Sequence, residues 1–295
     1  MRMEQLKDTA STAVTPRSPA IGIAYSGYTP LFLDEHGDAV DYVEVPFELL
    51  CHDSSVIEVR DVKPIVLHCA SLSVAGSVPP SEQTIDAIRG WIERTETPWL
   101  GEHLSFITAT RELAGPVADE YAPGEPYNIG YTVCPPMNEA TVERVLRVLA
   151  LAELRFPVPM LLENPPVYFP VPGSTMTQVE FVSEICARSS APLLLDLAHF
   201  YITSQTMGFD PCEAVLSYPL DRVVEVHLSG VETEAGGHWD NHAKRAPDIE
   251  FELLALVLAR SSVKAITLEY NWSARFPAAV LLEEIARARE TVAAS

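Results

Sequence analysis

Basic residues are scarce in this chain of 295 residues: Lys and Arg number 20 against 41 Asp and Glu, a formal net charge of −21. Such a surplus of acid would repel the phosphate backbone of DNA or RNA, and no cluster of Lys or Arg stands out as a local exception. We therefore expect no nucleic-acid partner. Bound cations would neutralise part of this acidity, although surface acid that keeps a protein in solution gives the same composition.

The chain also lacks long apolar runs. No stretch reaches the roughly 18 apolar residues that cross a bilayer, and the polar start over residues 1–18 lacks the apolar core of a secretory signal. We therefore expect a cytoplasmic protein with no membrane partner. Residues 1–18 are interpreted as a flexible arm, and residues 19–295 as one domain.

Cysteine and glycine motifs are absent as well. The five cysteines are scattered and form no C-x-x-C pair, which argues against a structural zinc or redox motif. The 14 glycines form no P-loop or dinucleotide-binding pattern, and no G-x-S-x-G nucleophile elbow occurs. The sequence gives no support for a nucleotide-binding protein or a serine hydrolase.

What the chain does contain is eight short apolar runs, several of them flanked by Pro or Gly, which is typical of strands buried on both faces. They cover residues 20–25, 39–45, 64–68, 99–103, 160–163, 192–196, 223–227 and 265–269. Helical spacing occurs over residues 81–94, 138–154, 177–189, 249–260 and 276–294. This alternation predicts parallel strands joined by helices, and eight strands in a chain of this length predict a single-domain (β/α)8 TIM barrel in the α/β class.

The longest irregular stretch runs from residue 107 to residue 137 and carries several Pro, Gly and Tyr residues. Loops of that length are usually functional, so we expect a lid or a substrate-binding loop.

In a (β/α)8 barrel the side chains at the carboxyl ends of the strands converge on one volume, where the active site lies. A single buried His or Asp is more often a hydrogen-bonded core residue than a ligand. Many such groups around one axis, however, need cations or mutual pairing to offset the cost of burial, so the pattern predicts a metal centre. At the expected strand ends stand His68, His103, Glu163, Asp196, His227 and Glu269, and nearby loops add Asn164, His199, Asp240 and His242.

The types of ligand narrow the choice of metal. Imidazole and carboxylate without thiolate suit iron, manganese or zinc. With roughly three to five protein ligands per ion, the set fills two sites and can extend to a third, and Glu163 could bridge two of them. Asp240 and His242 are two residues apart, which in an extended segment points both to one side. They form either a chelating pair or a polar turn held by its own side chains. Glu44 and Glu225 could support ligands or be ordinary barrel-layer residues.

Five blocks that carry these residues occur in a familiar order. They are Gly101-Glu-His-Leu-Ser-Phe106, Leu161-Leu-Glu-Asn-Pro165, Leu193-Leu-Leu-Asp-Leu197, Glu225-Val-His-Leu-Ser-Gly230 and Leu268-Glu269. Together they resemble the multinuclear non-haem iron-dependent oxidases (MNIO), the family of the methanobactin and thiaglutamate biosynthesis oxidases. The resemblance spans residues 19–286.

The resemblance implies a cytoplasmic TIM barrel that holds two or three iron ions (Fe2+/Fe3+) and uses O2 to modify a residue, often cysteine, of a ribosomally made precursor peptide. By resemblance His68, His103 and Glu163 would bind one iron, Glu163 or its neighbours would bridge, and Asp196, His227 and Glu269 would bind the next. Asn164, His199, Asp240 and His242 complete the second site or a third. Many members have Asn where this chain has His199, whose imidazole could serve as a full ligand.

The resemblance also implies a separate partner protein that captures the leader part of the peptide. Two other functions stay open on the residues alone. A xylose-isomerase-like barrel, acting as a sugar isomerase or phosphoesterase on divalent metals, would be marked by a pocket Lys or a basic rim. A scaffold barrel without catalysis would be marked by the loss of several ligands, but the series in this chain is complete.

Overall fold

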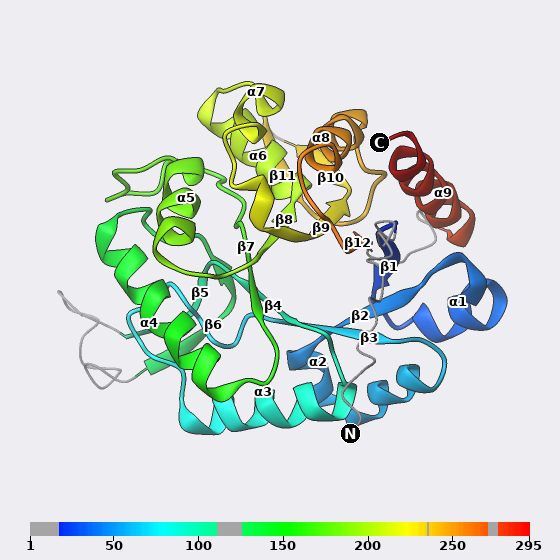
Figure 1. The fold of residues 1–295 in the computed structure, drawn as a ribbon, viewed down its shortest axis with the longest axis horizontal. Coiled ribbons are helices and arrows are strands. Elements are labelled where there is room, and N and C mark those ends of the chain that lie inside the picture. The colour runs from blue at the N-terminus through cyan, green and yellow to red at the C-terminus, as the bar shows by residue number, and fades with distance from the viewer. Residues whose placement is uncertain (1–17, 111–125, 235, 271–276) are drawn as a thin grey trace, which may run out of the picture.

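The computed structural model describes residues 18–110, 126–234, 236–270 and 277–295. Eight parallel strands close into a barrel in the order β1-β12-β9-β8-β7-β4-β3-β2 (Figure 1), which confirms the predicted TIM barrel. Residues 1–17 of the predicted arm lie outside the described residues. The barrel strands are β1 (Ala20–Ala24), β2 (Tyr42–Pro46), β3 (Ile65–Cys69), β4 (Leu100–His103), β7 (Met160–Glu163), β8 (Leu193–Asp196), β9 (Val223–Ser229) and β12 (Ala265–Glu269).

The inside of the barrel changes from apolar to ionisable along the strands. A small buried cluster of Tyr42, Val66, Trp99, Leu161, Leu194 and Ala265 lies apart from the main core between barrel and helices. Because side chains alternate between the two faces of a strand, the residue two positions further along points inward again. On four strands that next inward residue is ionisable: Glu44, His68, Glu163 and Asp196.

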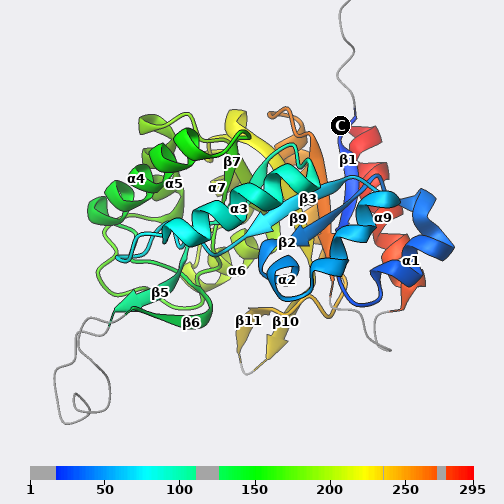
Figure 2. The same ribbon diagram turned by 90° about the horizontal axis from the view of Figure 1, so that it is seen from below.

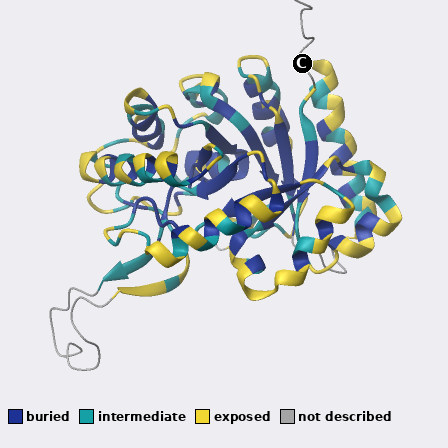
Figure 3. Ribbon diagram, turned by 60° about the horizontal axis from the view of Figure 1, so that its bottom comes forward, coloured by how far each residue is buried: buried dark blue, intermediate teal, exposed yellow. Residues whose placement is uncertain are grey.

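Helices surround the barrel and turn their apolar faces to it, while their outer faces are exposed (Figure 3). All five predicted helices are present, each beginning and ending within a few residues of its predicted bounds. The helices are α1 (Thr29–His36), α2 (Phe47–His52), α3 (Glu82–Thr95), α4 (Glu139–Arg155), α5 (Gln178–Arg188), α6 (Leu197–Met207), α7 (Pro211–Val215), α8 (Asp248–Leu258) and α9 (Ala278–Ala294), with short 3-10 turns η1 (Gly37–Ala39), η2 (Ser54–Asp61) and η3 (Leu220–Arg222).

Two antiparallel hairpins project from the end of the barrel at which the strands finish (Figure 2). One pairs β5 (Phe106–Thr110) with β6 (Pro126–Val133), and the other pairs β10 (Val231–Glu234) with β11 (Gly237–Asp240). The prediction of an irregular stretch over residues 107–137 was therefore wrong for residues 107–110 and 126–133, which pair with each other, whereas residues 134–137 are irregular as predicted. Residues 111–125 lie outside the described residues. Among the described residues no helix is long and apolar enough to cross a membrane.

Candidate metal centre

The first group of candidate ligands stands at the ends of three neighbouring strands, β3, β4 and β7. Oε2 of Glu163 lies 2.9 Å from Nε2 of His68 and 2.6 Å from Nδ1 of His103. The two imidazole rings meet edge to face, with centroids 4.6 Å apart. A Cβ at Gly101 would lie 2.6 Å from Cδ2 of His68, so the absence of a side chain there lets the His68 ring lie over β4. The three side chains are close enough to share one cation.

The second group shares Glu163 with the first and adds residues from β8, β9 and β12. Nδ1 of His227 lies 3.2 Å from Oε2 of Glu269, 3.7 Å from Oε1 of Glu163 and 3.9 Å from Oδ2 of Asp196. Three of these atoms, Oε1 of Glu163, Oδ2 of Asp196 and Nδ1 of His227, are buried without a hydrogen-bond partner among the described residues. Buried polar atoms rarely stay unpaired, and a cation among them would satisfy all three. The residues therefore fit a metal ion.

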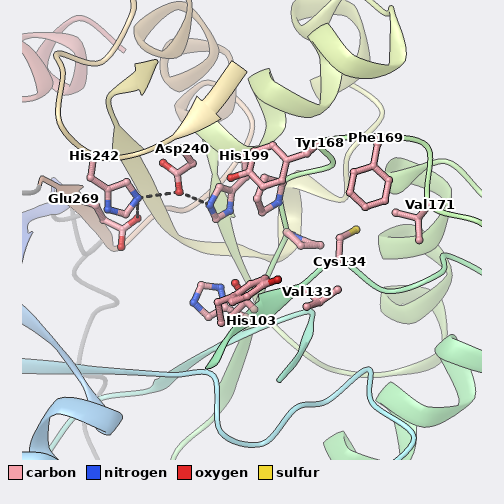
Figure 4. Close-up of a pocket in the computed structure, with 14 residues that line it drawn as sticks. His103, Val133, Cys134, Tyr168, Phe169, Val171, His199, Asp240, His242 and Glu269 are labelled. Carbon is pink, nitrogen blue, oxygen red and sulfur yellow. Dashed lines mark hydrogen bonds and ion pairs between the residues drawn. The ribbon is translucent and has the colours of Figure 1, made fainter. Parts of the chain in front are cut away.

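A third set comes from α6 and from the β10–β11 hairpin. Oδ2 of Asp240 lies 3.0 Å from Nε2 of His199 and 2.9 Å from Nε2 of His242 (Figure 4). The other ring nitrogen of His199 lies 2.8 Å from the backbone oxygen of Asn164, which leaves Nε2 facing Asp240. Ser229 donates its hydroxyl to Oδ1 of Asp240 at 2.9 Å. Both interpretations of the Asp240 and His242 pair are compatible with this contact.

Asn164 lies beside these ligands with both polar atoms of its side chain already engaged. Its Nδ2 donates to the backbone oxygen of Asp196 at 2.9 Å, and its Oδ1 accepts from the backbone nitrogen of Asp196 at the same distance. These bonds link the ends of β7 and β8. The structure thus brings the ligand atoms of nine of the ten expected residues close together. The side chain of the tenth, Asn164, instead links the ends of β7 and β8.

Carboxylates crowd together in this site, and their pKa values diverge. Burial opposes ionisation of Glu269, but His227 and His242 hold its pKa at about 2. Burial raises the pKa of Asp196 to about 7, against the lowering effect of His199. The carboxylates share only a few histidines that can stabilise their ionised forms. A bound cation would add positive charge and stabilise these ionised forms further.

Two further acids lie below the ligands inside the barrel, where sequence reasoning left their role open. Glu44 and Glu225 are both buried. Oε2 of Glu44 lies 3.0 Å from Nε2 of His227, and Glu225 accepts hydrogen bonds from Trp99 and Thr267. The available signal was the alternation of side chains along each strand, because Glu44 is two residues from Tyr42 and Glu225 is two residues from His227, so both acids point into the barrel.

A cavity of about 500 Å³ opens above the ligands. Among its described lining residues there is no Lys or Arg. Tyr168, which lines the cavity, stacks on Trp239 with ring centroids 5.1 Å apart and planes inclined by 27°. One side of the cavity carries His103, His199, Asp240, His242 and Glu269, and the opposite side carries Val133, Cys134, Phe169 and Val171 (Figure 4).

A closed parallel barrel with histidine and carboxylate groups at its strand ends defines a metal-binding TIM barrel. The chain belongs to the family of RiPP precursor modification enzymes MbnB/TglH/ChrH, whose sequence model matches residues 21–293. RiPP stands for ribosomally synthesised and post-translationally modified peptide. The match confirms the resemblance drawn from the five sequence blocks.

The chain is similar in sequence to curated relatives over most of its length, and similar in fold to solved structures. The chain is 29% identical over 243 residues to a UPF0276 protein of Caulobacter vibrioides, covering 81% of each chain. It is 26% identical over 279 residues to a UPF0276 protein of Rhizorhabdus wittichii, covering 93% of this chain and 92% of the other. A xylose isomerase domain containing protein from Salmonella typhimurium superposes with a TM-score of 0.58 at 16% identity, over 95% and 99% of the two chains. Endonuclease IV from Thermus thermophilus gives 0.55 at 16% identity, over 92% and 100%. At these identities the two structures share the fold alone.

Proposed function

We propose that the protein is an iron- and O2-dependent oxidase that modifies a cysteine of a ribosomally synthesised precursor peptide. The observation that carries the proposal is the pair of ligand groups that share Glu163, with three buried polar atoms left for a cation to satisfy. Membership of a peptide-modifying family supports the substrate class. Histidine and carboxylate ligands without thiolate suit iron.

A different set of side chains would hold each ion. His68, His103 and Glu163 would hold one iron, and Glu163, Asp196, His227 and Glu269 the next. His199, Asp240 and His242 would hold a third, with Asn164 bracing the ends of β7 and β8. Iron bound there would supply the one-electron chemistry by which dioxygen is reduced, and it would lower the pKa of a substrate thiol.

The cavity favours a peptide side chain over a sugar phosphate. No Lys or Arg is present among the described residues of its wall to bind phosphate or to polarise a sugar carbonyl. Its apolar side, with Val133, Phe169 and Val171, suits the carbon part of a peptide. The partner that captures the leader would be a separate chain, and its contact surface should be more basic than this acidic one.

The first experiment measures metal by mass spectrometry on protein purified without oxygen, beside a His227→Ala variant. We expect two or three irons per chain, sharply reduced in the variant. Manganese, zinc or magnesium with little iron would favour the isomerase-like barrel instead, and absence of any metal would refute the proposal.

The second experiment follows dioxygen uptake with a cysteine-containing peptide encoded near the gene. Removal of four electrons from the side chain reduces one O2 to two waters, so uptake and product should match one to one in that case. If the iron-loaded protein did not oxidise the peptide, the oxidase assignment would be contradicted.

A further inference from the structure

His227 is fully buried, and its two ring nitrogens face opposite groups of carboxylates. On one side Nδ1 faces Glu269, Glu163 and Asp196, which is the second ligand group. On the other side Nε2 lies 3.0 Å from Oε2 of Glu44. A neutral imidazole carries one proton, so only one of the two nitrogens can bind a metal while the other donates a hydrogen bond.

The side of Glu44 could in principle hold the cation, because Glu44, Glu225 and His227 also bring ligand atoms within 4.8 Å of one another. The oxygens of Glu225 are already occupied, however. Trp99 donates to Oε2 at 2.6 Å and Thr267 donates to Oε1 at 2.8 Å. Nε2 of His227 is 3.9 Å from Oε1 of Glu225, too far for a hydrogen bond. On this side of the ring, Glu44 rather than Glu225 is placed to receive a proton from Nε2 of His227.

On the Nδ1 side of His227 the polar atoms lack hydrogen-bond partners, in contrast to the Nε2 side. Nδ1 of His227, Oε1 of Glu163 and Oδ2 of Asp196 have no hydrogen-bond partner among the described residues. A cation there satisfies atoms that are otherwise unpaired, whereas a cation beside Glu44 would displace a good hydrogen bond. The preferred arrangement is therefore a metal at Nδ1 and a proton at Nε2.

We propose that Glu44 is a positioning residue: it accepts the Nε2 proton of His227, fixes the ring and its tautomer, and so presents Nδ1 to the metal. This inference rests on the metal centre in the proposed function. A carboxylate that accepts from a ligating imidazole also raises the basicity of the ligand, and loss of such a partner typically weakens metal binding about 10- to 100-fold.

The test uses zinc as a diamagnetic probe bound to the full chain labelled with 15N at histidine. In the wild type we expect the His227 spectrum to show a metal-bound Nδ1 and a protonated Nε2 whose proton is held in a hydrogen bond. Glu44→Leu removes the acceptor, so this proton should exchange rapidly and zinc affinity, measured against a competing chelator, should fall about 10- to 100-fold.

Two further variants separate positioning from folding. Glu44→Gln keeps an acceptor oxygen, so it should keep the proton signal while it loses part of the affinity, and it serves if Glu44→Leu fails to fold. Glu284→Gln is the matched control, because Glu284 is also buried but contacts Arg245 and Tyr270 rather than His227. The control should leave both the His227 signal and the zinc affinity unchanged.

Other outcomes overturn the inference. A protonated Nδ1 with metal on Nε2 would refute it, as would unchanged zinc affinity and an unchanged His227 signal in both Glu44 variants. Zinc binding as expected but no iron in protein purified without oxygen would refute the proposed function and leave the role of Glu44 intact. A wild type that binds no zinc at all would overturn both.

Discussion

Replacement of Glu163 by Gln tests the shared ligand most directly. Glu163 is 1% exposed and contacts both His68 and His103 in the first group, while its second oxygen faces the second group. The amide keeps the size of the side chain but loses the charge and half of its acceptor atoms. Because both groups include this carboxylate, we expect the variant to lose both ions rather than one.

The expected size of the effect follows from linkage. At free metal of about 100 times Kd, each bound ion stabilises the fold by about 2.7 kcal/mol. Two ions contribute about 5 kcal/mol, which at roughly 2 °C per kcal/mol for a chain of this size raises the melting temperature by roughly 10 °C. The wild type should show this rise when metal is added to metal-free protein, and Glu163→Gln should show almost none.

The assay is thermal unfolding with and without added iron(II) under anaerobic conditions, together with metal content. Glu252→Gln is the control, because Glu252 is exposed on α8 and lies outside both ligand groups. It should keep the full rise. If Glu163→Gln kept two ions and the same rise, the shared-ligand reasoning would be refuted.

Three further outcomes can be checked by thermal melts and metal analysis. Burial raises the pKa of Glu250 well above 4.5. The neutral form of Glu250 therefore stabilises the fold fully below about pH 4.5, and this stabilisation is lost as the pH rises through the raised pKa. The loss is at most about 1.4 kcal/mol per pH unit. Glu250→Gln should therefore be more stable than wild type at pH 8 with a smaller difference at pH 5, and equal differences would contradict this. Gly101→Ala should displace His68, destabilise by about 1–3 kcal/mol and lower metal content, whereas full metal content would count against the close approach. Trp239→Ala removes the stack on Tyr168 and should cost about 0.5–1.5 kcal/mol, and an unchanged melt would show that the stack contributes nothing.

The barrel and the convergence of most candidate ligands could be predicted because two simple regularities coincide. Strands buried on both faces are continuous apolar runs, which are easy to find, as in β7 and β8 with every residue buried. Closure of the barrel then brings strand ends together, so residues as distant in sequence as His68 and Glu269 could be assigned to one site.

What escaped prediction has physical reasons too. Helix α6 gave no helical pattern because seven of its residues between Leu197 and Ser204 are buried, which leaves no polar face to set the period. The roles of Glu44 and Glu225 depend on which neighbours they meet across the barrel interior. Those contacts are set by strand register, and a single strand does not reveal it. The strand pair β5 and β6 depends likewise on long-range pairing between segments that read as a loop.

The origin of the third ligand set in a hairpin has a consequence for the lifetimes of bound ions. His68, Glu163 and His227 stand on barrel strands, which open only with the whole fold, whereas Asp240 and His242 belong to a partly exposed two-stranded hairpin and the residues directly after it. Two-stranded hairpins open at low free energy. Ions in the barrel should therefore exchange as slowly as the protein unfolds, while an ion at the hairpin should exchange each time the hairpin opens. A protein purified slowly would then carry two ions, and the same protein supplied with excess metal would carry three.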